Sequence, residues 1–278
     1  MYVLILDHIL DLLVCPLCRN SLIQVSNNLL QCSKCKHKYS IKNDVIDLLP
    51  AVLVKGSDRR WMDFYDKTAE NYYRLFHKII PLITLGLEDR LRRKWVDKLG
   101  IKQGDIVLDV STGTGKNIPF LLKKVGDKGL VFGIDISINM LHYAYSMISK
   151  KKWNNVVLIR ANASYLPFKD NIFDAVFHVG GINTFEEKEK AVEEMIRVAK
   201  PGSRIIVVDG GLKPRYRDTW WGRKLIKSNK LYLSVPPVDK FKEILGNSNV
   251  RVKWGIFLNR LLPIWPYYVI EAVKPAGN

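Results

Sequence analysis

The segment between residues 104 and 135 constrains the fold of this chain more than any other part of it. Residues 106–110 form a short apolar run typical of a buried strand, residues 111–115 read Ser-Thr-Gly-Thr-Gly, and a helical pattern begins at Ile118. A second apolar run, residues 130–135, ends in an aspartate. Because glycines in such a turn let the backbone approach a ligand closely, this order of elements predicts a nucleotide cradle.

The details of the glycine turn favour one kind of nucleotide. A dinucleotide fingerprint needs a third glycine three residues after Gly115, and that position is Ile118. The sequence also lacks the Gly-x-x-x-x-Gly-Lys-Ser/Thr pattern of a phosphate loop. S-adenosylmethionine carries no phosphate, and it suits Asp109, the two glycines and the terminal Asp135, whose carboxylate can accept hydrogen bonds from ribose hydroxyls.

The remainder of the chain continues the alternation of strands and helices. A helical pattern covers residues 186–199, and Lys-Pro-Gly-Ser at residues 200–203 leads into the next strand. The expected strands beyond the cradle are residues 156–161, 175–179, 204–209, 250–257 and 267–273. This alternation predicts an α/β fold, with a Rossmann-like, mostly parallel, seven-stranded sheet whose last two strands form an antiparallel edge.

Several stretches around the cradle resemble one family of enzymes. The matching residues are 107–115, 133–135, 161–174 and 197–202, and residues 64–72 resemble the opening segment of the same enzymes. They are similar to class I S-adenosylmethionine-dependent methyltransferases of type 11, the group that includes the ubiquinone and menaquinone biosynthesis C-methyltransferases. The resemblance covers roughly residues 62–275 and implies the class I methyltransferase fold, S-adenosylmethionine as cofactor and methyl transfer as the reaction.

The resemblance also implies, position by position, which residues bind the cofactor. Asp109 and residues 113–115 of the glycine turn would surround the methionine part. Asp135 would hold the ribose, and Asn162 with Ala163 would flank the adenine. Ser111 stands where the family usually has its first glycine, and a serine fits there if its φ angle is negative. The full expected set is Asp109, Ser111, Gly113, Thr114, Gly115, Asp135, Ile136, Asn162 and Ala163.

All four cysteines of the chain lie in one short segment, as two Cys-x-x-Cys pairs separated by thirteen residues. Four thiolates at this spacing suit a tetrahedral, structural zinc site. The expected ligands are Cys15, Cys18, Cys32 and Cys35. Two disulfides or four free thiols are the alternatives. His37 is either a replacement for one cysteine ligand or, as we prefer, a surface residue just after the second pair. Residues 21–30 predict a hairpin between the pairs and residues 41–50 a closing strand, which is the pattern of a zinc ribbon.

A zinc ribbon ahead of a methyltransferase domain is similar to the layout of the large-subunit rRNA guanine N1-methyltransferases. Such ribbons also occur in small partner proteins of methyltransferases, so the resemblance leaves both RNA and protein partners open. We expect a ribbon at residues 1–57, a helical bridge at 58–103 and a methyltransferase domain at 104–278, with Pro50 and residues 55–60 as the linker.

The helical bridge carries an aromatic stripe and a basic run. The stripe consists of Trp61, Phe64, Tyr65, Ala69, Tyr72 and Tyr73. Such a stripe is either part of the core or a cover over the bound cofactor. The basic run at residues 90–94 is either a solvated helix face or a nucleic-acid surface.

The acceptor site is less determined by the sequence. Residues 212–249 form an expected substrate lid, whose aromatic and basic residues suit RNA bases, a membrane interface or an ordinary helical cover. His178 is the best candidate for a general base and Asp209 a weaker one, since both lie at the ends of strands, which face the ligand crevice, and a structural histidine is the alternative for His178. Residues 177–183 lack the Asp/Asn-Pro-Pro-aromatic motif, and the cysteines are committed to the ribbon, which argues against adenine N6 and pyrimidine C5 methylation.

The net charge of +17 favours acidic partners such as RNA or an anionic membrane surface. Residues 1–14 are apolar but interrupted by Asp7, His8 and Asp11, so we predict neither a signal peptide nor a transmembrane segment, and a cytoplasmic location. We expect a methyltransferase for a small or lipid-like acceptor. The alternatives are an rRNA or tRNA base methyltransferase and a non-catalytic scaffold that binds the cofactor.

Overall fold

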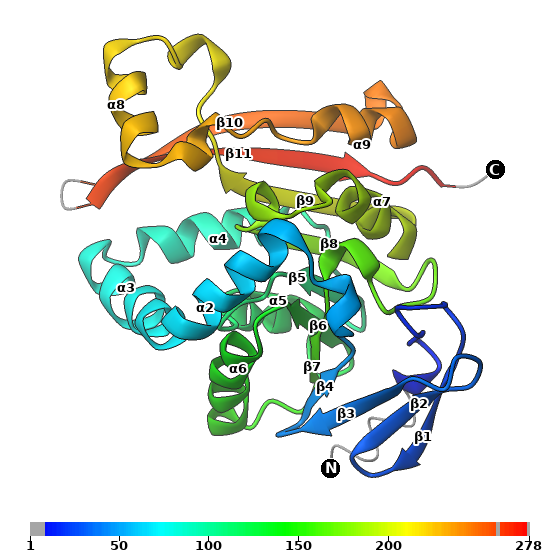
Figure 1. The fold of residues 1–278 in the computed structure, drawn as a ribbon. Helices are drawn as coiled ribbons and strands as arrows, with labels where there is room; N and C mark the ends of the chain where they lie inside the picture. Colours follow the sequence, from blue (N-terminus) through cyan, green and yellow to red (C-terminus); the bar gives the residue numbers. More distant parts are fainter. Residues whose placement is uncertain (1–8, 260–261, 277–278) are drawn as a thin grey trace.

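A computed structural model describes residues 9–259 and 262–276 of the chain, and its centre is a sheet of eleven strands (Figure 1). The strands are β1 (Leu22–Ser26), β2 (Leu29–Cys32), β3 (Lys38–Lys42), β4 (Val45–Asp47), β5 (Ile106–Val110), β6 (Leu130–Asp135), β7 (Val156–Arg160), β8 (Phe173–Val179), β9 (Ala199–Gly210), β10 (Val250–Asn259) and β11 (Leu262–Val273). Their order across the sheet is β1-β2-β3-β4-β7-β6-β5-β8-β9-β11-β10.

The seven strands from β7 to β10 in this order confirm the predicted sheet. Strands β7, β6, β5, β8 and β9 pair in parallel, whereas β11 is antiparallel to β9 and β10 is antiparallel to β11. The helices are α2 (Gly56–Arg74), α3 (Ile80–Ile83), α4 (Leu87–Asp97), α5 (Ile118–Val125), α6 (Ile138–Lys151), α7 (Lys188–Val198), α8 (Trp220–Ser228) and α9 (Val238–Leu245). Five residues in π-helical conformation, η2 (Leu75–Ile79), join α2 to α3.

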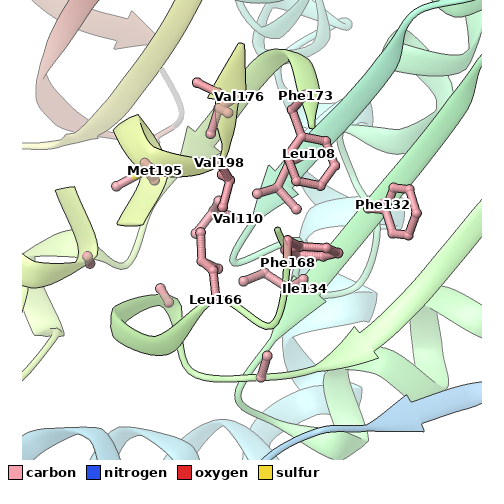
Figure 2. Packing of buried hydrophobic residues seen from close by; sticks show 14 of the residues in the cluster. Leu108, Val110, Phe132, Ile134, Leu166, Phe168, Phe173, Val176, Met195 and Val198 are labelled. Atoms are coloured by element: carbon pink, nitrogen blue, oxygen red, sulfur yellow. The ribbon is translucent and has the colours of Figure 1, made fainter. Parts of the chain in front are cut away.

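Alternate residues of the central strands face two separate layers of helices, as the two-residue period of a strand requires. Val107 and Val131 pack with α4 and α5 on one face. Their neighbours Leu108 and Phe132 pack on the other face in a cluster that includes residues of α7 and α9. Figure 2 shows this second cluster, in which Phe132, Phe168 and Phe173 meet edge to face with ring centroids 4.8–5.6 Å apart.

The ribbon is continuous with the central sheet. The hairpin of β1 and β2 is formed as predicted, and β3 adds to it. Strand β4 then pairs in parallel with β7, placing Asp47 opposite Arg160. The same cluster that contains Phe168 also contains Leu13 and Leu30, so the ribbon and the larger domain share one hydrophobic core.

The prediction of a linker at Pro50 and residues 55–60 is wrong. Helix α2 begins at Gly56, and the side chain of Asp58 is 6% exposed. Asp58 accepts a hydrogen bond from the Asn162 amide at 2.9 Å and another from the Glu186 backbone N–H at 3.0 Å. These two partners lie more than a hundred residues away along the chain, so the local polar composition gave no indication of them.

Among the described residues, no helix is both long and apolar enough to cross a bilayer.

Candidate functional site

A pocket opens at the carboxyl ends of the parallel strands, where ligands of open α/β sheets bind. Seven of the nine residues expected to bind the cofactor line it, namely Ser111, Gly113, Thr114, Asp135, Ile136, Asn162 and Ala163. Asp209 lines it as well, and Trp61, Tyr65, Tyr72 and Phe76 form a wall of aromatic rings. Of the expected substrate lid at residues 212–249, only Leu231 is among the lining residues.

The glycine turn adopts a backbone that the sequence only partly predicted. Ser111 has a φ angle of 55°, so the condition of a negative φ is not met, and the serine occupies the left-handed region that glycine adopts more readily. Gly113 also has a positive φ, and a Cβ atom there would point into open space. At Gly115 a Cβ atom would lie 2.8 Å from the Met147 Cε and 3.2 Å from the Ala144 Cβ, so glycine is needed for the turn to pack on α6.

Asp109 lies beneath the turn and does not line the pocket. Its carboxylate accepts hydrogen bonds from the Thr112 hydroxyl at 2.7 Å and the Asn117 amide at 3.1 Å. Arg92 in turn donates to the Asn117 side-chain oxygen at 2.6 Å. Burial raises the pKa of Asp109 to about 6 despite these donors. Asp109 therefore holds the turn in shape, and the implied contact with the methionine part is corrected to a supporting role.

Asp135 lies at the end of β6 and faces the pocket. One carboxylate oxygen accepts the Gly113 backbone N–H and the other accepts the Ser137 backbone N–H, both at 2.9 Å. Burial raises the pKa of this group to about 6, and the backbone donors oppose that effect. Each oxygen retains a further lone pair, so the carboxylate is oriented by the backbone and remains able to accept hydrogen bonds from a ligand.

Asn162 and Ala163 follow β7 and line the pocket beside the first turn of α2. The Asn162 side-chain oxygen accepts the Ser164 backbone N–H, and its amide donates to Asp58 and to the Leu53 carbonyl at 2.8 Å. The amide hydrogens are thus used to fix the start of α2. Asn162 therefore connects the start of α2, the helix that covers the pocket, to the segment after β7 that lines the pocket.

The aromatic stripe of α2 divides between the pocket and other surroundings. Tyr65 and Tyr72 face the pocket, with ring centroids 6.1 Å apart, and Tyr72 stacks on Phe76 at 4.3 Å. Phe64 is half exposed, and Tyr73 stacks on Tyr143 instead. Four aromatic rings of this segment, those of Trp61, Tyr65, Tyr72 and Phe76, therefore line the pocket.

Polar contacts of Asp66 and His77 connect the segment that covers the pocket to the domain beneath it. Asp66 accepts hydrogen bonds from the Ser137 hydroxyl at 2.5 Å and from the Asn139 backbone N–H at 3.1 Å. His77, in the π-helical turn, lies with its Nε2 2.9 Å from the Thr114 hydroxyl. Burial lowers the pKa of His77 to about 4, so the ring stays neutral near pH 7.

His178 does not lie in the pocket lining, and the expectation that it acts as a general base is corrected. Its side chain is fully buried. The Ile182 backbone N–H donates to Nε2 at 3.1 Å, which requires Nδ1 to carry the proton, and Nδ1 lies 3.0 Å from the Val110 carbonyl oxygen. Burial lowers the pKa of the ring to about 4. Both nitrogens are thus committed to backbone groups, and His178 ties the ends of β5 and β8 together.

Asp209 is the predicted base that the structure does place in the pocket. Its Oδ2 accepts the backbone N–H groups of Gly181 at 3.1 Å and Asn183 at 3.0 Å. Burial raises its pKa above the ordinary value, while these donors act in the opposite direction. A fixed carboxylate with a raised pKa is suited to accept a proton from a ligand.

Arg160 was missed by sequence reasoning because no motif surrounds it. It ends β7 and donates from Nε to the Ile136 carbonyl oxygen at 3.1 Å and from Nη1 to Asp47 at 3.1 Å. The Nη2 atom of Arg160 lies 3.4 Å from the Met62 sulfur on α2. One side chain thus connects the ribbon, the cover helix and the segment that follows Asp135.

The four cysteine sulfurs gather at one point, all within 4.8 Å of one another. The Cys15 and Cys35 sulfurs are 3.6 Å apart, and those of Cys18 and Cys32 are 3.4 Å apart. A tetrahedron with Zn–S bonds of about 2.3 Å has sulfurs about 3.8 Å apart, so the cluster has the dimensions of a zinc site. The Tyr39 hydroxyl lies 3.0 Å from the Cys15 sulfur, and His37 is not part of the cluster.

Comparison with known families gives two matches along the chain. Residues 53–214 match the ubiE/COQ5 methyltransferase family, and residues 8–44 match the Trm112p-like protein family. The ubiquinone/menaquinone biosynthesis C-methyltransferase UbiE of Legionella pneumophila strain Philadelphia 1 is 31% identical over 166 residues, which are 57% of this chain and 65% of that protein. UbiE of Yersinia pestis bv. Antiqua is 37% identical over 129 residues, 46% of this chain and 51% of that protein. The chain thus spans less than two thirds of the length of these relatives.

Solved structures share the fold. A SAM-dependent methyltransferase from Aquifex aeolicus superposes with a TM-score of 0.52 at 24% identity, covering 75% of this chain and 98% of that one. The [4+2]-cyclase SpnF superposes with a TM-score of 0.53 at 18% identity, covering 68% of this chain and 81% of that one. At these identities the superpositions establish the class I fold, which serves more than one reaction.

Proposed function

We propose that this chain, which belongs to the ubiE/COQ5 methyltransferase family, transfers a methyl group from S-adenosylmethionine to a small or lipid-like acceptor. The observation that carries the proposal is the pocket itself, which joins Asp135 and the glycine turn to a wall of aromatic rings and to a buried carboxylate, Asp209. The relatives named as ubiquinone/menaquinone biosynthesis C-methyltransferases favour a carbon atom of a lipid-like, quinone-related molecule as the acceptor.

The lining residues fit S-adenosylmethionine in chemistry and position. Asp135 would accept hydrogen bonds from the ribose hydroxyls, and Asn162, Ala163 and Ile136 would border the adenine. Ser111, Gly113 and Thr114 would lie along the methionine part, where a side chain at Gly113 would fill open space. When bound, the cofactor supplies an electrophilic methyl group on its sulfonium sulfur.

The residues around the acceptor would then position it and remove a proton. The rings of Tyr65, Tyr72 and Phe76 would exclude water and hold an apolar ring by contact. A ring carbon becomes a better nucleophile when a neighbouring hydroxyl group loses its proton. The Asp209 carboxylate, held by the Gly181 and Asn183 N–H groups, would receive that proton.

The cysteine cluster would hold a structural zinc ion through Cys15, Cys18, Cys32 and Cys35. The tetrahedral dimensions of the four sulfurs and the match to the Trm112p-like family support this proposal. Four protein ligands leave no open position, so the ion would stabilise the ribbon and take no part in methyl transfer.

The proposed methyltransferase would act in the cytoplasm.

The first test is binding of S-adenosylhomocysteine, followed by calorimetry and by the rise in melting temperature. We expect binding by the wild type and a loss of at least about tenfold in affinity for Asp135→Asn, because the carboxylate would otherwise accept two charge-assisted hydrogen bonds. Asp127→Asn, at an exposed position, is the matched control and should bind like the wild type. A wild type that does not bind contradicts the proposal.

The second test identifies the acceptor. The protein is incubated with methyl-labelled cofactor and, in separate reactions, with lipid extract, total RNA and small metabolites. Label in the lipid or metabolite fraction supports the proposal. Label in RNA supports the second candidate, an RNA base methyltransferase, which the net charge of +17 and the ribbon favour. Cofactor binding with no labelled product in any fraction supports a non-catalytic scaffold.

A further inference from the structure

The segment that joins α2 to α4 presents an unusual apolar surface. Residues 79–87 read Ile-Ile-Pro-Leu-Ile-Thr-Leu-Gly-Leu, without a charge. Leu82 and Leu85 are 75% and 82% exposed, more than any other described leucine. The apolar tip, as we call this surface, consists of Leu75, Ile79, Leu82, Leu85 and Leu87, all of which are exposed. In Figure 1 this segment lies around α3, on the left side of the molecule.

The tip has the opposite polarity to an ordinary surface turn. Thr84, the polar side chain of the run, is fully buried, whereas the leucines on either side of it point to solvent. Leu85 also has a φ angle of 49°, in the left-handed region that leucine rarely adopts. The turn is closed by a hydrogen bond from the Gly86 N–H to the Pro81 carbonyl at 2.9 Å. A strained turn that exposes leucines to solvent indicates an interaction site, at which these side chains contact an apolar partner.

The exposed charged residues within residues 74–90 are all basic. Arg74, Lys78 and Arg90 are exposed and flank the apolar residues. The two acidic residues of the segment, Glu88 and Asp89, are turned inward. Glu88 is buried and paired with Arg92, and Asp89 lies 2.7 Å from the Lys116 ammonium. The exposed leucines of the tip therefore lie beside basic side chains. This arrangement is complementary to an anionic surface, and charge repulsion disfavours dimerisation through two such tips.

The tip also adjoins the pocket. Tyr72 and Phe76 line the pocket and belong to the same helical segment as Leu75 and Ile79. We infer that the apolar tip inserts into the interfacial layer of an anionic lipid bilayer, with Arg74, Lys78 and Arg90 on the headgroups, so that a lipid-like acceptor reaches the pocket beside the aromatic wall. The biological purpose of this contact rests on the proposed function, but the contact itself does not require methyl transfer.

Sedimentation with vesicles tests the inference. The full chain is mixed, without cofactor, with vesicles of phosphatidylcholine alone or with phosphatidylglycerol in a roughly 2:1 ratio. We expect binding to the mixed vesicles that weakens as salt is added. Leu82→Asn combined with Leu85→Asn should weaken that binding at least about tenfold, because two leucines no longer enter the apolar layer. Arg74→Gln combined with Lys78→Gln should weaken binding to the mixed vesicles by about tenfold.

The matched control is Ile23→Asn combined with Val25→Asn, which removes two exposed apolar side chains from the ribbon. It should bind vesicles like the wild type. The inference is wrong if the wild type does not bind, if the control loses binding as strongly as the leucine variant, or if the leucines instead mediate a dimer seen by gel filtration. S-adenosylhomocysteine binding by each variant reports an intact pocket, so a failure of vesicle binding is distinguishable from a failure of the proposed activity.

Discussion

Replacing His178 with asparagine separates its structural role from a catalytic one. The folded protein holds this imidazole neutral, with a pKa lowered from 6.5 to about 4 by burial, whereas the unfolded chain protonates it near pH 6.5. The unfolded state therefore binds more protons as the pH falls, and the stability that His178 contributes at neutral pH is lost between about pH 6.5 and pH 4. These two pKa values give a loss of about 2 kcal/mol between pH 7 and pH 4.5.

The measurement is the free energy of unfolding by urea at about pH 7 and pH 4.5 for the wild type and His178→Asn. The other titrating groups are common to both proteins, so the difference between them should narrow by about 2 kcal/mol at the lower pH. The shorter asparagine side chain has no acceptor at the position of Nε2, so the Ile182 N–H loses its partner and the variant should be less stable than the wild type at pH 7. A pH-independent difference would refute the buried neutral histidine. A fall of more than about 100-fold in kcat with unchanged cofactor affinity would restore His178 as the base.

Three further predictions follow from other contacts. Ser111→Gly should raise the free energy of unfolding by about 0.5–1 kcal/mol, because it relieves a positive φ angle; an unchanged urea midpoint would contradict this. Arg160→Lys should weaken S-adenosylhomocysteine binding by about fivefold in calorimetry, because lysine does not bridge Asp47 and the Ile136 carbonyl, while Arg204→Lys, remote from the pocket, should leave affinity unchanged. A chelator should lower Tm by roughly 5 °C or more if the cysteines hold zinc, and a metal content near zero before treatment would refute that.

The sheet could be predicted from the sequence because its strands are short apolar runs with clear ends. The run ending in Asp135 shows both the strand and the ligand-facing carboxylate, since strand ends of a parallel sheet meet at one side. The cysteine pairs were equally informative because their spacing alone limits where four thiolates can meet. In these places local pattern and tertiary structure agree.

The sequence failed where long-range contacts decide the role of a polar residue. Asp58 lies in a polar run that resembles a linker, yet Asn162 binds it from more than a hundred residues away. Arg92 belongs to a basic run that resembles a solvated face, yet it is buried and donates to Asn117. His178 lies near the end of a strand, as a catalytic base would, and only the Val110 and Ile182 backbone groups reveal its structural use. Local composition carries no information about such partners.

The pairing of β4 with β7 has a consequence for how this chain avoids aggregation. Without β4, β7 would be an apolar edge strand whose backbone N–H and C=O groups along Val156–Arg160 are unpaired on one side. Strands of other molecules could then pair with this edge. Strand β4 occupies that edge, and the shared core with Leu13 and Leu30 keeps it in place. A fragment that begins at α2 should therefore retain the residues of the pocket and yet precipitate. The ribbon thus protects the edge of the sheet from aggregation.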